Sequence, residues 1–148
     1  MTYTQEVGKK LNALLEKTYD SEKGFTKASE NIDNKMLKSY FKSKSQERNT
    51  FGHELKKEIR SYNQEIDKGG SVAGTAHRAW MDIKAFLSLE DEESMLEEAI
   101  RGEKTAVKEY DDVLTETSLP SSTKSLLESQ KNKIENGLNN IKTLEDIY

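Results

Sequence analysis

The chain has 148 residues, a formal net charge of −4, one proline and no cysteine, and only 33% of its residues are hydrophobic. The length predicts a single domain spanning residues 1–148. The absence of cysteine excludes disulfide scaffolds and cysteine-ligated zinc or iron–sulfur sites, and two histidines, His53 and His77, exclude a histidine-rich metal centre. No apolar run approaches the roughly 18 residues of a membrane span, and no signal segment follows Met1. We therefore expect a soluble, cytoplasmic protein with no membrane partner.

The apolar residues recur at helical spacing, and no stretch shows the alternation of a strand. Asn34 is placed to cap one helix, and Pro120 marks the start of another. The pattern predicts five helices, at about residues 4–32, 35–66, 72–87, 92–116 and 120–146.

Four of these helices have about 25–32 residues, which is roughly 37–48 Å at 1.5 Å per residue. Long helices with narrow apolar stripes predict an all-α four-helix bundle. The short helix at residues 72–87 would carry the chain back along the bundle, as in the single long crossover of ferritin-like topology. A plain bundle with a kinked third helix is the alternative.

Each long helix also directs a polar side chain toward its apolar stripe, at 100° per residue. These inward polar residues are Glu22, Lys44, Arg48, Glu103 and Gln130. Di-iron sites of ferritin-like bundles use inward carboxylates together with two Glu-x-x-His motifs, and this sequence contains no such motif. Two inward cations would also repel a bound metal. We therefore predict a buried ion-pair cluster of Glu22, Lys44, Arg48 and Glu103, with no catalytic or cofactor-binding residues. A metal site at Glu22 and Glu103, with di-iron or another divalent metal, stays open as the alternative.

Charge is distributed unevenly along the chain. Residues 1–74 carry 14 basic and 11 acidic groups, and residues 75–148 carry 9 and 16. This asymmetry fits the two halves packing on each other or on a partner copy. The net acidity gives no electrostatic case for nucleic acid, so none is expected as a partner. The acidic run from Glu90 to Glu98 fits a helix N-terminus, where the macrodipole favours carboxylates; a cation or a basic partner is the functional alternative.

Several stretches together resemble an uncharacterised bacterial family of ferritin-like four-helix-bundle proteins. The resemblance rests on Gly70-Ser71-Val72-Ala73-Gly74, His77-Arg78-Ala79-Trp80, Ile83-Lys84, Glu22 with Gly24-Phe25, Gln46 with Arg48 and Phe51, Arg101-Gly102-Glu103 with Ala106 and Tyr110, and Leu119-Pro120. It implies a ferritin-like bundle that self-associates in a bacterial cytoplasm, and it implies no activity. The sequence departs from the family pattern at Lys44, where an apolar residue is usual, and at Leu138, where a histidine is frequent.

Three functions are compatible with these features. The first, which we favour, is a non-enzymatic scaffold or binding protein that forms a homo-oligomer such as a dimer. The second is a ferritin-like oxidase or metal-storage protein that uses Glu22 and Glu103. The third is a small-molecule sensor with an interhelical pocket lined by Tyr40, Trp80 or Tyr110.

Overall fold

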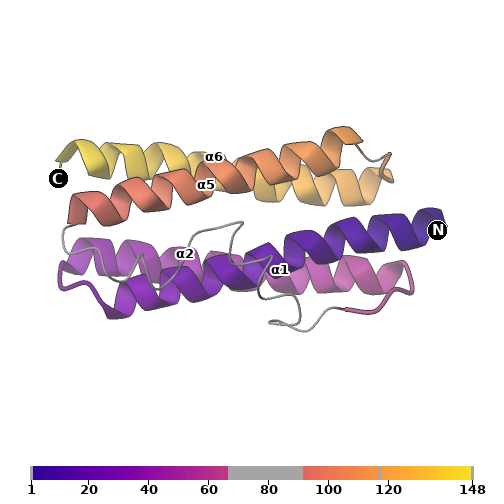
Figure 1. Ribbon diagram of the computed structural model, residues 1–148, viewed down its shortest axis with the longest axis horizontal. Coiled ribbons are helices and arrows are strands. Elements are labelled where there is room, and N and C mark those ends of the chain that lie inside the picture. Colours follow the sequence, from indigo (N-terminus) through magenta and orange to yellow (C-terminus); the bar gives the residue numbers. More distant parts are fainter. Residues whose placement is uncertain (1, 67–91, 117, 148) are drawn as a thin grey trace. The chain divides into compact units, whose positions relative to one another are not determined.

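The computed structural model describes residues 2–66, 92–116 and 118–147, and these residues form four helices and no strand (Figure 1). The helices are α1 (Tyr3–Glu30), α2 (Lys35–Ser61), α5 (Glu92–Glu116) and α6 (Ser121–Ile147). The architecture is all-α and is consistent with the predicted four-helix bundle. The predicted short helix at 72–87, and with it the ferritin-like crossover, lies outside the described residues.

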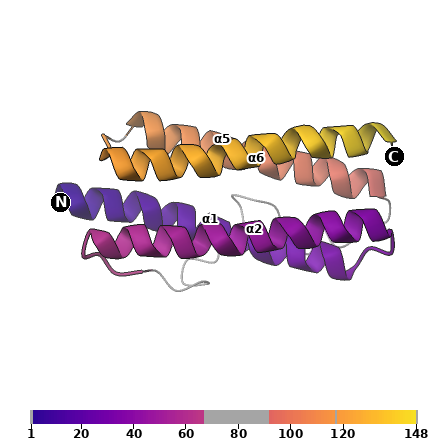
Figure 2. The same ribbon diagram turned by 180° about the vertical axis from the view of Figure 1, so that it is seen from behind.

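The chain divides into two compact units, residues 1–80 and 81–148. In the first unit, α1 and α2 run antiparallel along one another, joined by the short turn at residues 31–34 (Figures 1 and 2). In the second unit, α5 and α6 lie side by side as a second antiparallel pair. The prediction of one domain stays a prediction.

Local sequence explains where the first two helices begin. Thr2 caps α1 in a capping box, in which its side chain accepts from the backbone N–H of Gln5 while the Gln5 side chain accepts from the backbone N–H of Thr2. The Asn34 side chain accepts from the N–H groups of Met36 and Leu37, which confirms the predicted cap of α2. These side chains satisfy backbone donors that have no partner inside the helix.

The end of α2 corrects the predicted range of 35–66, because the helix stops at Ser61. Asn63 has a φ of 58°, in the left-handed region that asparagine tolerates better than most residues. The chain then reverses, and the Asn12 Nδ2 of α1 donates to the Glu65 carbonyl at 2.9 Å. Gly8 allows a close approach beside this contact, because a Cβ there would lie 2.5 Å from Gln64 Cγ and one of the two residues would have to shift.

In α2 and α6 most buried positions alternate at spacings of three and four residues. In α2, apart from Gly52 and Ile59, they are Leu37, Phe41, Lys44, Arg48, Phe51 and Leu55, and in α6 they are Thr123, Leu127, Gln130, Ile134, Gly137 and Ile141. This seven-residue repeat is typical of helices that pack along their whole length with side chains interlocked. Polar residues occupy a few positions of these seams, and they form the candidate site.

Candidate functional site

Arg48 lies at the middle of α2 and is only 2% exposed, which makes it one of the largest fully buried side chains described. Its Cζ atom lies 5.6 Å from the ring centroid of Phe25 on α1 and 5.6 Å from that of Phe51 on α2. A guanidinium over an aromatic face is attracted by the ring quadrupole, and the attraction grows when water is excluded. Two phenyl rings therefore hold this charge within the apolar seam.

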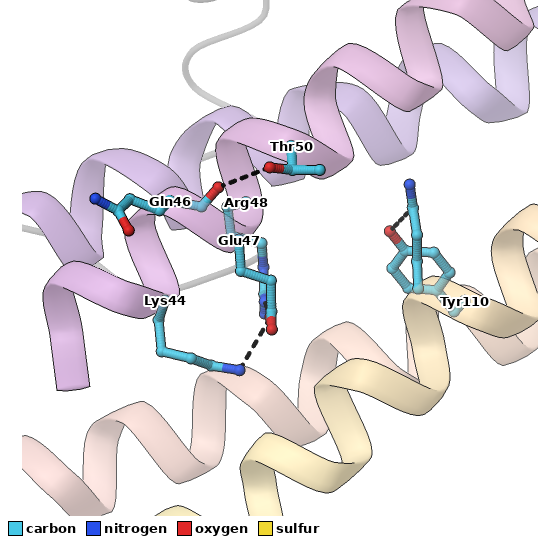
Figure 3. A network of polar contacts seen from close by, with 7 residues as sticks. Lys44, Gln46, Glu47, Arg48, Thr50 and Tyr110 are labelled. Atoms are coloured by element: carbon cyan, nitrogen blue, oxygen red, sulfur yellow. Dashed lines mark hydrogen bonds and ion pairs between the residues drawn. The ribbon is translucent and has the colours of Figure 1, made fainter.

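Glu47 joins the two buried cations of α2 (Figure 3). Its Oε1 atom accepts from Lys44 Nζ at 2.9 Å and from Arg48 Nη1 at 2.8 Å. The Lys44 and Arg48 side chains are 6% and 2% exposed, whereas that of Glu47 is 25% exposed. Charge-assisted hydrogen bonds of this kind are stronger than neutral ones, so the carboxylate offsets part of the cost of burying both cations. We call Lys44, Glu47 and Arg48 the α2 charge cluster.

Glu47 is the member that the helical pattern missed. At 100° per residue it lies about 80° from the mean apolar direction of α2, at the margin of the stripe. The position of Glu47 in the sequence does indicate a contact with the cations, because Glu47 follows Lys44 by three residues and directly precedes Arg48. Residues three apart are neighbours on a helix surface, so a carboxylate at this position can reach the inward cations.

Glu22, the first predicted member of the cluster, is half-buried and contacts a different group. Its Oε2 atom accepts from Asn49 Nδ2 at 3.0 Å, across the α1–α2 pair. Its backbone carbonyl accepts from Thr26 Oγ1 at 2.8 Å and from Ser45 Oγ at 3.4 Å. In the described part of the chain Glu22 makes no ion pair with Lys44 or Arg48.

The second unit buries Glu103 completely, at 0% exposure on α5. In the same unit Tyr110 Oη donates to Gln130 Oε1 at 2.5 Å, which joins α5 to α6 through two buried neutral groups (Figure 3). The position of Gln130 on the inward face of α6 agrees with the sequence pattern. That Glu103 belongs with Arg48 in one cluster stays a prediction.

Among the residues that the structure describes, no three His, Cys, Asp or Glu side chains lie together as ligands of a metal ion. His53 is exposed on the outer side of α2, as predicted, and His77 lies outside the described residues. The α2 charge cluster contributes two cations and one carboxylate, which is a poor donor set for a divalent metal because the cations repel it. A metal at Glu22 and Glu103 stays an untested alternative.

The predicted acidic run is described only from Glu92 onward. Glu92 and Glu93 occupy the first turn of α5, where the helix dipole favours carboxylates. Glu98 is ion-paired with Arg101 on the same helix. Both observations agree with a structural role for these carboxylates.

Two of the three residues of the proposed sensor pocket can be placed. Tyr40 is half-buried on α2 with its ring edge-on to Phe41, at 5.6 Å between centroids. Tyr110 is 4% exposed on α5, with its hydroxyl bonded to Gln130. Trp80 lies outside the described residues, so the pocket as a whole stays a prediction.

No helix of the described residues is long and apolar enough to cross a membrane. No curated protein matches the chain. Residues 6–116 match the model of a family described as a domain of unknown function, DUF2383. Because the match covers most of the chain, the protein belongs to the DUF2383 family.

Proposed function

We propose that the protein is a non-enzymatic helical module, a scaffold or binding protein with a ferritin-like arrangement, in which buried ion pairs occupy the place of a di-metal site. The observation that carries the proposal is the convergence of Lys44 and Arg48 on the Glu47 carboxylate, with both cations excluded from water. In some proteins a buried group of this kind contributes conformational specificity rather than stability. A cytoplasmic location is part of the proposal and is supported by the family resemblance of the sequence.

The self-associating part of the proposal is supported by the opposite charge of the two halves, +3 for residues 1–74 and −7 for residues 75–148. Oppositely charged surfaces attract one another and disfavour wrong partners. We expect light scattering coupled to size exclusion to give the mass of a homodimer. A monomer at all concentrations would refute self-association and leave the ion-pair proposal untouched.

Metal content tests the ion-pair proposal against the metal alternative. The protein is produced with iron, manganese or zinc supplied, and bound metal is measured after gel filtration. We expect far less than one ion per chain. Stoichiometric metal that is lost in Glu103→Ala, and retained in the exposed control Glu128→Ala, would establish the metal alternative instead.

The unfolding free energy of a Glu103 variant tests whether Glu103 belongs to the buried ion-pair cluster. If this carboxylate is buried beside a cation, Glu103→Gln removes one partner of a buried pair and costs about 3–5 kcal/mol of unfolding free energy. Glu128→Gln, on an exposed position of α6, is the matched control. Equal stability of both variants and the parent protein would remove Glu103 from the cluster.

A further inference from the structure

The outer face of α2 carries a continuous row of hydrogen-bond donors. At 100° per residue the eight side chains fall within about 100° of arc, and all eight are exposed. We call this row the α2 basic stripe; it consists of Lys35, Lys38, Lys42, Gln46, Asn49, His53, Lys57 and Arg60. It has five positive charges and no carboxylate, although the whole chain has a net charge of −4.

The outer faces of the other helices carry paired cations as well as some that have no ion pair in the described part of the chain, such as Lys9, Lys23, Lys104 and Lys133. Each of the other three helices has at least one exposed pair at i,i+3 or i,i+4: Lys27–Glu30 on α1, Lys108–Asp112 on α5 and Lys124–Glu128 on α6. Within the described part of the chain, none of the five cations of the stripe has an ion pair. The stripe therefore presents positive charge that this part of the chain does not neutralise.

The stripe is long, straight and narrow. From Lys35 to Arg60 it spans about 37 Å along the helix axis at 1.5 Å per residue. Half-buried carboxylates flank it, with Glu54 and Glu58 on one side and Glu22 bonded to Asn49 on the other. Positive potential is thus confined to a line, which matches a linear array of anionic oxygens better than a flat surface of headgroups.

The stripe has the composition of a surface that binds phosphates. Cores of protein–protein interfaces are apolar and rich in aromatic residues, and the stripe contains no apolar side chain. Stacking platforms for single-stranded nucleic acid require aromatic rings, which are also absent from the stripe. Binding to the phosphate backbone of a duplex requires neither apolar nor aromatic side chains, because the binding free energy comes from the release of condensed counterions.

We propose that the α2 basic stripe binds the phosphate backbone of double-stranded nucleic acid, without sequence preference. Phosphate contacts position a protein on a duplex and carry no sequence information. The net acidity of the chain does not oppose this, because at about 0.1 M salt charges beyond a Debye length of about 10 Å are screened. The stripe lies on the opposite side of α2 from the charge cluster, so this proposal stands or falls independently of the ion-pair part of the proposed function.

The test is fluorescence anisotropy of a labelled 25-base-pair DNA duplex, titrated with the full chain at 30–200 mM salt. If all five cations contact phosphates, the logarithm of the binding constant falls with log[salt] at a slope of about −4.5. The affinity then drops on the order of 500-fold between 50 and 200 mM. A parent protein that does not bind the duplex at 30 mM salt would overturn the proposal.

Two double variants probe the ends of the stripe, Lys38→Gln with Lys42→Gln and Lys57→Gln with Arg60→Gln. Each should weaken binding on the order of 100-fold at 50 mM salt and reduce the slope by about 2. The matched control, Lys108→Gln with Lys124→Gln, makes the same change of net charge on other helices and should alter affinity by less than about twofold. Equal losses in stripe and control variants, or a loss at only one end, would overturn the proposal.

Vesicles with and without anionic phospholipid are the second probe. We expect the parent protein to bind the duplex in preference to either vesicle. Stronger binding to anionic vesicles that is lost in the stripe variants would reassign the stripe to a membrane surface and overturn the proposal. Circular dichroism of each variant verifies that its helix content is unchanged.

Discussion

The two helix pairs place polar groups in their seams in different chemical forms. In the α1–α2 pair the group is ionic, with Arg48 between Phe25 and Phe51 and bonded to Glu47. In the α5–α6 pair the buried hydrogen bond that joins the two helices is neutral, from Tyr110 to Gln130. Removing one partner of a buried neutral hydrogen bond costs about 1–3 kcal/mol, whereas removing one partner of a buried ion pair costs about 3–5 kcal/mol because it leaves an uncompensated charge. The two pairs should therefore respond differently to truncation.

The largest effect is expected at the ionic seam. Arg48→Ala removes one of the largest fully buried side chains, leaves a cavity between two rings and deprives Glu47 of a partner. We expect a loss of about 3–5 kcal/mol of unfolding free energy, measured by urea denaturation. Arg60→Ala, on the exposed side of the same helix, should lie within about 0.5 kcal/mol of the parent. A loss below about 1 kcal/mol in Arg48→Ala would show that the ionic seam is not more costly to disrupt than the neutral one.

The neutral seam should lose less. Tyr110→Phe removes a hydroxyl that donates to Gln130 at 2.5 Å, and we expect a loss of about 1–2 kcal/mol. Combining it with Gln130→Leu replaces both partners by apolar groups and should recover part of that loss. If the loss of unfolding free energy in the double variant exceeds the summed losses of the two single variants, the comparison between the two seams fails.

A smaller effect separates two glycines of the α1–α2 pair. A Cβ at Gly52 would meet Leu15 Cδ1 at 3.9 Å, an ordinary contact. Gly52→Ala should therefore raise the unfolding free energy by up to about 1 kcal/mol through its helix propensity, which a higher thermal midpoint would report. Gly8→Ala gains the same propensity but forces a Cβ to 2.5 Å from Gln64 Cγ, so it should gain less or lose stability. Equal gains in unfolding free energy in both variants would show that the reversal after α2 makes no restrictive steric contact with α1.

The smallest effect concerns Lys131 on α6, whose Nζ is ion-paired with Asp111 of α5. The hydrogen bond that Lys131 donates to Asp111 raises the pKa of Lys131 above its usual value. A raised pKa means that the pair stabilises the folded state below the unfolded pKa of about 10.4, and that this stabilisation is lost as pH rises through the folded pKa. The pair is partly exposed, so we expect less than about 1 kcal/mol. The difference in stability between the parent and Lys131→Met should shrink between pH 9 and pH 12; a difference that does not change would refute the assignment.

Local chemistry made much of the fold predictable. Asn34 fixes the start of α2, and the predicted range of 92–116 agrees with α5. The end of α2 was not predictable in the same way, because the reversal at Asn63 depends on contacts of Gln64 and Glu65 with a helix more than 50 residues earlier. Helical periodicity uses only neighbours in sequence, so it extended α2 to residue 66.

The candidate site shows a similar division. Averaging around the helix identified Lys44 and Arg48, because both lie close to the centre of the apolar stripe. It missed Glu47, whose backbone lies at the margin while its carboxylate reaches inward to the cations. The net charge of the whole chain likewise does not reveal the α2 basic stripe, which contains no carboxylate.

The guanidinium of Arg48 also bears on how α1 and α2 align along their length. A seam of leucines alone would allow the two helices to slide by one seven-residue repeat with little change in packing. Here such a slide would separate the charge from the Phe25 ring and bring it against a different layer of α1. Misaligned hairpins thus become unequal in energy to the observed one, and a single buried ion selects one alignment among several.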